Sequence, residues 1–407
     1  MILNFNLPMH FAIVGPEILT ETGLQRGVLE IDAGYIKNIH ASVESLPKGL
    51  FILNYPENYY LLPGMIDLHI HGSFGFDTMD GSEDALSQIS QSLAKKGTTG
   101  YLATTMTAPP NLIEQVLAAV KIYKENNIQT GAELLGVHLE GPFISPNRMG
   151  AQNAEYIQKP NIKLFKKWQE ISGNNIRLVT IAPEVEGAWD LIKYLKDTGV
   201  TVSLGHTDAS CKVALQAIDH GATHCTHLYN AMSALHHRTP GVALAVLKDS
   251  RVRAELIADG IHVAPEMLDL TLKIKTSEKL VLVTDAMRAQ CLGEGEYDLG
   301  GQKVWVKNNS ARLASGVLAG SVLTLDQAFF NIRDFTGCDL KDAVKMACEN
   351  PAKQIGVFDQ RGSIKIGKKA DLVLLGSENA EGLKNLKAQS AQKIQAVFCR
   401  GKLERLA

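Results

Sequence analysis

Hydrophobic and polar positions follow two different patterns along this chain. Between about residues 61 and 358, short apolar runs typical of buried strands alternate with longer segments whose apolar residues recur at helical spacing, such as SEDALSQISQSLAKKG and PPNLIEQVLAAVKIYKEN. The apolar runs are MIDLHIHG, GYLATTM, LLGVHLEG, IRLVTIAPE, VTVSLGHTD, ATHCTHLYN, AELIADGIH and LVLVTDAM. About eight strand-helix alternations in roughly 300 residues predict an α/β fold, a (β/α)8 TIM-like barrel.

The two ends of the chain have a different pattern, with short alternating strands and glycine turns. HFAIVG, GVLEIDAGYIKNIH and LFILNY precede residue 60, and GSIKIGKKADLVLLG and IQAVFCRGK follow residue 358. We therefore predict a small β-sandwich domain built from residues 1–60 and 359–407, with the barrel formed by residues 61–358 between them. The polar stretch at 376–393 is expected to be a loop or a short helix.

The composition of the chain limits the classes of binding partner and the cellular compartment that we expect for the protein. The 407 residues carry a formal net charge of −2 without a run of Lys or Arg, which argues against nucleic acid or an anionic membrane as the main partner. The chain has neither about 18 consecutive apolar residues nor a basic start typical of a signal peptide. Its six cysteines show no C-x-x-C spacing, so we expect a reducing, cytoplasmic location without a disulfide framework.

Candidate chemistry gathers where the predicted barrel strands end. In PGMIDLHIHG, the pleat of a strand places Asp67, His69 and His71 on one face and the aliphatic residues on the other. Further polar residues end later strands: His138, Glu140, His206, His224, His227, His262 and Asp285. In a parallel barrel these ends meet at the mouth, where active sites lie. Imidazole and carboxylate ligands suit Zn²⁺ or Fe²⁺, which activate water for hydrolysis.

Several of these residues have an equally simple structural interpretation. An isolated H-x-H can be a half-exposed strand with incidental histidines, and His138 can be a ligand or a supporting core residue. His224 and His227 would face opposite ways in a strand, so both are not expected to bind metal. Two further positions are more easily explained by packing or exposure than by ligation: Cys225 in the core and His220 on a helix surface. His236 and His237 lie in a loop, where a structural and a functional interpretation are comparable.

The motifs together resemble the amidohydrolase superfamily and, within it, the family of N-acetylglucosamine-6-phosphate deacetylases. PGMIDLHIHG, GVHLEGPFISPNRMGAQ, LGHTDAS, THLYNAMSALHHRTPG, ADGIHV, VTDAM and LAGSVLTLDQA carry this resemblance over nearly the whole chain. It implies hydrolysis of the acetamide of N-acetyl-D-glucosamine 6-phosphate to D-glucosamine 6-phosphate and acetate. It also implies one or two divalent ions, Zn or Fe, per subunit, a small amino sugar phosphate as partner, and a homodimer.

The resemblance also implies residue roles. Glu140, His206 and His227 would hold the principal ion, while His69 and His71 would hold a second ion that Glu140 bridges. Asp285 would act as general base towards the activated water and then as general acid towards the leaving amine. Substrate contacts are implied for Ala151, Gln152, Asn230, Ala231, His237, Arg238, Asp259, Gly260, Ile261, His262, Leu318, Ala319 and Gly320. Among these, the guanidinium fork of Arg238 suits a phosphate.

One position departs from the family pattern, and the substrate stays open. Some members have a histidine where this chain has Gln152, which donates a hydrogen bond but has no titratable proton. We expect a second ion at His69 and His71 to take over part of that task. Alternatives are N-acetylgalactosamine 6-phosphate as substrate, a cyclic-amide hydrolase, and a non-catalytic metal-binding regulator. The cyclic-amide members commonly bridge two metals with a modified lysine, whereas this chain has Glu140 there.

Overall fold

The computed structural model describes residues 7–126, 130–377 and 392–406. At its centre, eight parallel strands form one sheet in the order β17-β16-β15-β14-β13-β12-β11-β8. These strands are β8 (Met65–Ile70), β11 (Thr98–Thr104), β12 (Glu133–Glu140), β13 (Ile176–Ile181), β14 (Thr201–Leu204), β15 (Ala222–Cys225), β16 (Arg253–Leu256) and β17 (Leu280–Leu282). A parallel bridge between Ile70 and Ala286 joins the two sheet edges. The sheet therefore closes, and the predicted (β/α)8 barrel is confirmed.

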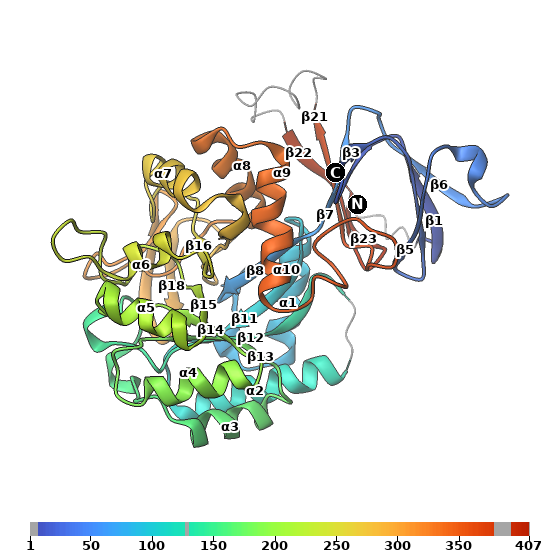
Figure 1. Cartoon of the computed structure of the whole chain (residues 1–407). Coiled ribbons are helices and arrows are strands. Elements are labelled where there is room, and N and C mark those ends of the chain that lie inside the picture. The colour runs from blue at the N-terminus through green and yellow to red at the C-terminus, as the bar shows by residue number, and fades with distance from the viewer. Residues whose placement is uncertain (1–6, 127–129, 378–391, 407) are drawn as a thin grey trace.

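Helices follow the strands and cover the outside of the barrel (Figure 1). They are α1 (Glu83–Ala94), α2 (Pro110–Glu125), α3 (Ile162–Ile171), α4 (Ala188–Asp197), α5 (Cys211–His220), α6 (Val242–Lys248), α7 (Pro265–Lys275), α8 (Leu325–Thr336), α9 (Leu340–Val344), a π-helical segment (Lys345–Glu349) and α10 (Asn350–Gln354). The predicted helical segments at 82–97 and 109–126 correspond to α1 and α2. Ser82 caps α1 by accepting a hydrogen bond from the backbone N–H of Ala85, and α2 begins at a proline.

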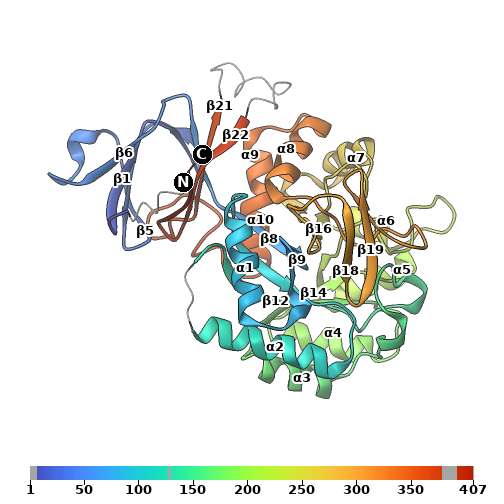
Figure 2. The same cartoon turned by 180° about the vertical axis from the view of Figure 1, so that it is seen from behind.

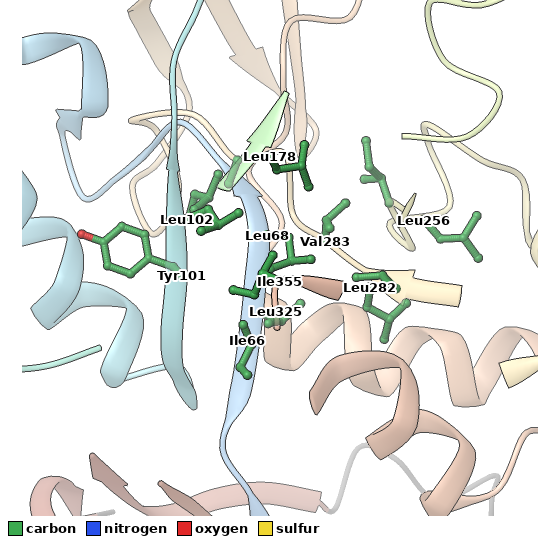
Figure 3. Close-up of a cluster of buried hydrophobic side chains, with 14 of the residues drawn as sticks. Ile66, Leu68, Tyr101, Leu102, Leu178, Leu256, Leu282, Val283, Leu325 and Ile355 are labelled. Atoms are coloured by element: carbon green, nitrogen blue, oxygen red, sulfur yellow. The ribbon is translucent and has the colours of Figure 1, made fainter. Parts of the chain in front are cut away.

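The aliphatic face of each barrel strand packs against the surrounding helices. In β8, Ile66, Leu68 and Ile70 are buried in the large apolar core, as alternation with the polar face predicts. Figure 3 shows Leu68 close to Leu282 and Ile355 in this core. This packing fixes the strand, so that its polar residues face the interior and the mouth of the barrel.

Two further sheets lie together on one side of the barrel (Figure 1). The first has the order β5-β4-β1-β6 and the second β23-β22-β21-β7-β2-β3. Their strands are β1 (His10–Val14), β2 (Glu17–Thr20), β3 (Gly23–Gln25), β4 (Val28–Asp32), β5 (Tyr35–His40), β6 (Phe51–Asn54), β7 (Tyr60–Pro63), β21 (Leu372–Ser377), β22 (Gln392–Cys399) and β23 (Lys402–Leu406). A separate apolar core that includes Phe11, Leu61 and Phe398 holds them together.

Strands from both ends of the chain share the second of these sheets. β7 pairs antiparallel with β21, and Leu62 lies opposite Val373. The boundaries at residues 60 and 358 stay a prediction of the sequence pattern. Residues 378–391, most of the polar stretch predicted as a loop or short helix, lie outside the described residues.

A small insertion after β17 adds three antiparallel strands, β18 (Gly295–Leu299), β19 (Gln302–Lys307) and β20 (Ser310–Leu313). Figure 2 shows β18 and β19 as a hairpin next to the barrel strands. A smaller pair, β9 (Gly72–Ser73) and β10 (Phe76–Asp77), follows β8. Single-turn 3₁₀ helices lie at Val43–Ser45, Thr78–Asp80, Pro146–Arg148, Ala154–Tyr156 and Ser277–Lys279. Among the described residues, no helix has the length and apolarity that crossing a membrane requires.

Candidate metal centre and active site

The carboxyl ends of five barrel strands bring six of the predicted site residues together. They come from the end of β8, the end of β12 and the loops just after β14, β15 and β17, and they are His69, His71, Glu140, His206, His227 and Asp285. All six are buried. Their ligand atoms fall into two groups whose members lie within 4.8 Å of one another: Glu140 with His206 and His227, and His69 with His71 and Asp285.

Glu140 lies between the two groups. Its Oε1 is 3.1 Å from the Nε2 atoms of both His206 and His227 and 3.3 Å from Nε2 of His69. Its Oε2 is 3.2 Å from Nε2 of His71. One carboxylate therefore faces four imidazole nitrogens, which is the placement that a bridging ligand requires.

Asp285 completes the second group. Its Oδ1 lies 3.2 Å from Nε2 of His71 and 3.4 Å from Nε2 of His69. The backbone N–H of Asp285 donates to the carbonyl oxygen of His69, and its own carbonyl accepts from the N–H of Ser321. The main chain thus holds this carboxylate against the end of β8.

The arrangement of ring nitrogens and carboxylate oxygens around Glu140 suits a bound divalent cation better than a set of direct hydrogen bonds. Nδ1 of His206 donates to the carbonyl oxygen of Arg148 at 2.9 Å, so Nε2 of the neutral ring carries a lone pair. That lone pair faces Nε2 of His227 at 3.1 Å as well as the carboxylate of Glu140. Without a proton on one of the two Nε2 atoms, the nitrogen lone pairs and the carboxylate oxygen repel one another, whereas a cation between them makes all three ligands.

The pKa shifts of His71 and Glu140 also indicate that this cluster requires positive charge. Burial lowers the pKa of His71, but hydrogen bonds and charges from Asp285 and Glu140 outweigh it and raise the pKa to about 9. Burial raises the pKa of Glu140, but the charge of His69 and hydrogen bonds from His206 and His227 bring it well below its ordinary value. A buried cluster of this kind calls for protons or for metal ions.

Three of these residues have left-handed backbone conformations. The φ angles are 48° for His206, 28° for His227 and 49° for Asp285. Residues other than glycine adopt this region at a cost in free energy, and such strain clusters at functional sites. Each of the three follows a barrel strand, so the strained turn directs its side chain into the mouth.

A cavity of about 160 Å³ opens onto this cluster. Its lining includes predicted ligands, predicted substrate contacts and residues that the sequence did not single out: His71, Met106, Glu140, Gly150, Ala151, Gln152, His206, His227, Asn230, Ala231, His262, Asp285, Leu299, Val317, Leu318 and Gly320. Met106 and Leu299 lack a motif that could have marked them. Leu299 belongs to the inserted hairpin, so this insertion contributes one wall.

Two of the lining side chains are held in a defined orientation. Gln152 accepts a hydrogen bond from the backbone N–H of Thr107 at 2.6 Å and donates to Oε2 of Glu140 at 2.9 Å. Nδ1 of His262 donates to Asp259 at 2.7 Å, which leaves its Nε2 for the cavity. Asp259 therefore lies behind His262 and does not line the cavity.

Five other predicted substrate contacts lie away from the cavity lining. His237 and Arg238 are exposed in the loop between β15 and α6, with Nη1 of Arg238 2.8 Å from Nε2 of His237. Gly260 and Ile261 lie in the turn before His262, and Ala319 is buried beside Leu318.

His138, His220 and His224 lie outside the cavity lining. His138 lies inside the barrel, donates from Nδ1 to the carbonyl of Leu68 at 3.2 Å and accepts from the hydroxyl of Thr180 at 2.7 Å. Burial and the charge of His69 lower its pKa to about 3, so the ring is neutral, and its ligand atom lies within 4.8 Å of those of His69 and Glu255. His224 faces Glu255 in the interior, Cys225 is buried, and His220 is exposed at the end of α5.

Glu255 is a buried charged residue next to the ligands that the sequence did not single out. It lies in β16, is fully buried, and accepts hydrogen bonds from His69 and His224. Its only signal in the sequence is a carboxylate inside the otherwise apolar run AELIADG.

Comparison with known proteins accounts for this combination of barrel and ligand cluster. Residues 60–403 match the amidohydrolase family. The chain belongs to the amidohydrolase family. It is a hydrolase that acts on carbon-nitrogen bonds.

Relatives and solved structures are similar over nearly the full chain. An N-acetylglucosamine-6-phosphate deacetylase of Bacillus subtilis is 45% identical over 89% of this chain and 92% of the relative. An N-acetylgalactosamine-6-phosphate deacetylase of Escherichia coli O157:H7 is 38% identical over 88% of this chain and 93% of the relative. The N-acetyl-D-glucosamine-6-phosphate deacetylase of Mycobacterium smegmatis, solved as a mutant with N-acetyl-D-glucosamine-6-phosphate, is 31% identical, with a TM-score of 0.88 over 98% of this chain and 100% of that one.

Proposed function

We propose that this amidohydrolase removes the acetyl group of N-acetyl-D-glucosamine 6-phosphate, releasing acetate and D-glucosamine 6-phosphate. The observation that carries the proposal is the position of Glu140, whose two oxygens face imidazoles of two separate groups while the same carboxylate lines the cavity. The names of the Bacillus subtilis and Mycobacterium smegmatis relatives support this substrate.

We assign Glu140, His206 and His227 to one divalent ion and His69, His71 and Asp285, with Glu140 shared, to a second. Nitrogen and oxygen ligands suit Zn²⁺ or Fe²⁺ alike, so ion availability decides between them. When bound, the cation acidifies water and polarises the acetamide carbonyl.

Asp285 is the proposed proton carrier. Burial raises its pKa, whereas the charges of His69 and His71 and a hydrogen bond from His71 lower it, with a net lowering, so the group is a carboxylate at neutral pH. It lines the cavity, where it takes a proton from the attacking water and returns it to the leaving nitrogen. An amine is a poor leaving group without that proton, so hydrolysis depends on both halves of this transfer.

The cavity wall positions the sugar. Asn230, Ala231 and His262 lie on one part of the lining, and Leu318 and Gly320 lie on another. Gln152 is committed to Thr107 and Glu140, so its direct effect is to hold that carboxylate. We assign the phosphate to Arg238 and His237 on the exposed loop, where a guanidinium fork can bind two phosphate oxygens.

The proposal extends to the assembly and the compartment. A homodimer is the state that the family resemblance implies, and a cytoplasmic location agrees with six free cysteines.

The decisive experiment measures acetate and free amine from N-acetyl-D-glucosamine 6-phosphate with the purified, metal-loaded protein. Chelated wild-type protein and an Asp285→Asn variant are the controls. We expect Asp285→Asn to lower turnover by about 10²- to 10⁴-fold, the usual contribution of general acid-base catalysis. Absence of turnover in the metal-loaded wild-type protein would contradict the proposed substrate.

A second substrate is favoured by one specific observation, the similarity to the N-acetylgalactosamine-6-phosphate deacetylase of Escherichia coli O157:H7. Measuring kcat/KM for both epimers under the same conditions ranks them. A higher value for the galactosamine epimer would reassign the substrate and leave the proposed chemistry of Asp285 unchanged.

A further inference from the structure

Glu255 is a fully buried carboxylate beneath the two proposed ligand groups. Its Oε2 accepts from Nδ1 of His69 at 2.9 Å and from the backbone N–H of His227 at 2.9 Å. Its Oε1 accepts from Nε2 of His224 at 3.0 Å. It does not line the cavity, so it acts on the site through these partners rather than on substrate.

The contact with Glu255 decides which nitrogen His69 presents to the mouth. Because Nδ1 donates its proton to the carboxylate, Nε2 is the nitrogen that is left to present a lone pair to a cation. Among the described residues, no hydrogen-bond partner reaches this Nε2, which lies 3.3 Å from Glu140 and 3.4 Å from Asp285. The atom is fully buried, aimed at both carboxylates, and available as a ligand.

The contact with His227 acts on the other ligand group. The backbone of His227 is in the left-handed region, with φ of 28°. Such a turn is costly for a residue with a Cβ, and a charge-assisted hydrogen bond to its N–H helps to hold it. Glu255 contacts only the backbone of His227, whereas in His69 it accepts a hydrogen bond from the imidazole ring that is the proposed ligand.

We propose that Glu255 is a positioning residue that makes His69 a metal ligand and thereby determines the affinity of the second ion. This inference rests on the proposed metal-dependent function. Carboxylate-bound imidazoles are oriented and more basic, and loss of such partners costs about 10- to 100-fold in metal affinity. By contrast, His206 of the first group donates to a neutral backbone carbonyl, that of Arg148, and does not depend on Glu255.

Charge balance points the same way. Glu140, Asp285 and Glu255 place three carboxylates around His69, and one divalent cation cannot neutralise them. Uncompensated buried charge is expensive, so the remaining charge calls for a second cation or for a proton on His69 or His71.

The test is a metal titration of Glu255→Gln, which keeps the shape of the side chain and removes its charge. The metal-free protein is titrated with Zn²⁺ against a chromophoric chelator, and bound zinc is counted after equilibrium dialysis. We expect two equivalents in the wild type. In Glu255→Gln, the second equivalent should bind about 10- to 100-fold more weakly. The first should bind as in the wild type, because the amide oxygen of the new side chain still accepts from the backbone N–H of His227.

Asp67→Asn is the matched control because Asp67 is also a buried carboxylate under β8 but has no imidazole partner. It accepts from the hydroxyl of Thr284 at 2.6 Å and from backbone N–H groups of His69 and Thr284. We expect this variant to bind both equivalents as the wild type does. A general loss of structure would weaken both equivalents in both variants, whereas the proposed role moves only the second one in Glu255→Gln.

Three results would overturn the inference: wild-type affinity for both ions in Glu255→Gln, equal loss of the second ion in Asp67→Asn, or one equivalent in the wild type. A different result would contradict the proposed deacetylase function. If the wild type binds two ions and Glu255→Gln loses the second, but no acetate is released from N-acetyl-D-glucosamine 6-phosphate, then the substrate is wrong and the role of Glu255 stands.

Discussion

Strand β12 carries a glutamate at each of its ends, half-buried Glu133 and buried Glu140, and the two meet opposite surroundings. At the carboxyl end, Glu140 faces four imidazole nitrogens at 3.1 to 3.3 Å. At the amino end, Glu133 accepts hydrogen bonds from Arg361 at 2.6 Å and from Lys369 at 2.9 Å. Both carboxylates are charged, but their partners differ in whether they carry permanent charge.

Arg361 and Lys369 neutralise the charge of Glu133 without an added proton or metal ion. Burial raises the pKa of Glu133, but the charges of Arg361 and Lys369 outweigh it and lower the pKa to about 2. Guanidinium and ammonium groups stay charged at neutral pH, whereas imidazoles do so only when protonated. The Glu133 end therefore stabilises the contact between β12 and the segment that joins α10 to β21, while the Glu140 end is balanced only by added protons or cations.

The largest expected effect follows from removing the carboxylate at the mouth. Glu140→Ala takes the shared ligand from both groups, so we expect turnover to fall by about 10⁴-fold, the upper range for catalytic groups of this kind. Bound zinc should fall with it, and chelator should no longer lower the Tm as it does for the wild type. Acetate release, metal analysis and thermal unfolding with and without chelator check this, and near-normal turnover with bound zinc would contradict it.

The matched change at the other end should act on stability alone. Glu133→Ala removes the hydrogen-bonded partner of Arg361, of which only 1% is exposed, and leaves it the carboxylate of Asp371 at 3.4 Å. We expect a loss of about 3 kcal/mol in the free energy of unfolding, the lower end for a broken buried ion pair, because Asp371 still balances part of the guanidinium charge. Urea unfolding measures it. The shift of Tm with chelator should persist in this variant; its loss would mean that the two ends of β12 are coupled.

The pH dependence of the free energy of unfolding tests whether Glu133 acts on stability through its charge. The folded pKa of Glu133 is about 2, below the ordinary 4.5, so its stabilisation is complete above pH 4.5 and is lost as the pH falls towards 2. The difference in unfolding free energy between the wild type and Glu133→Gln should shrink by about 2 kcal/mol between pH 7 and pH 3. Urea titrations of both proteins across this range give the difference, and a constant difference would refute the assignment.

The sequence predicted the mouth better than the rest because its information is local. Alternation in β8 places His69 and His71 on one face, and strand ends mark Glu140 and Asp285, so spacing alone locates these groups. Glu133 and Arg361 are 228 residues apart, and only the folded chain pairs them.

The same limit hid Glu255 and the orientation of the ligands. Glu255 meets His69 across 186 residues, and its strand reads as an ordinary apolar run. The ring of His206 is fixed by a backbone carbonyl, that of Arg148, which no side-chain motif encodes. The inserted hairpin supplies Leu299 to the cavity, although nothing in the alternation of a barrel predicts that contact.

The smallest effect concerns Arg238 and His237, the proposed phosphate-binding residues, which lie outside the cavity lining. Arg238 and His237 are exposed and reach the substrate only if its phosphate extends to their loop. Arg238→Ala should raise KM for N-acetyl-D-glucosamine 6-phosphate about tenfold with little change in kcat, because a charged hydrogen bond contributes about 1.5 kcal/mol of binding. The unphosphorylated N-acetyl-D-glucosamine should react equally with both proteins. If instead kcat falls for both substrates, Arg238 acts on the mouth itself and the phosphate must be bound by residues of the cavity wall.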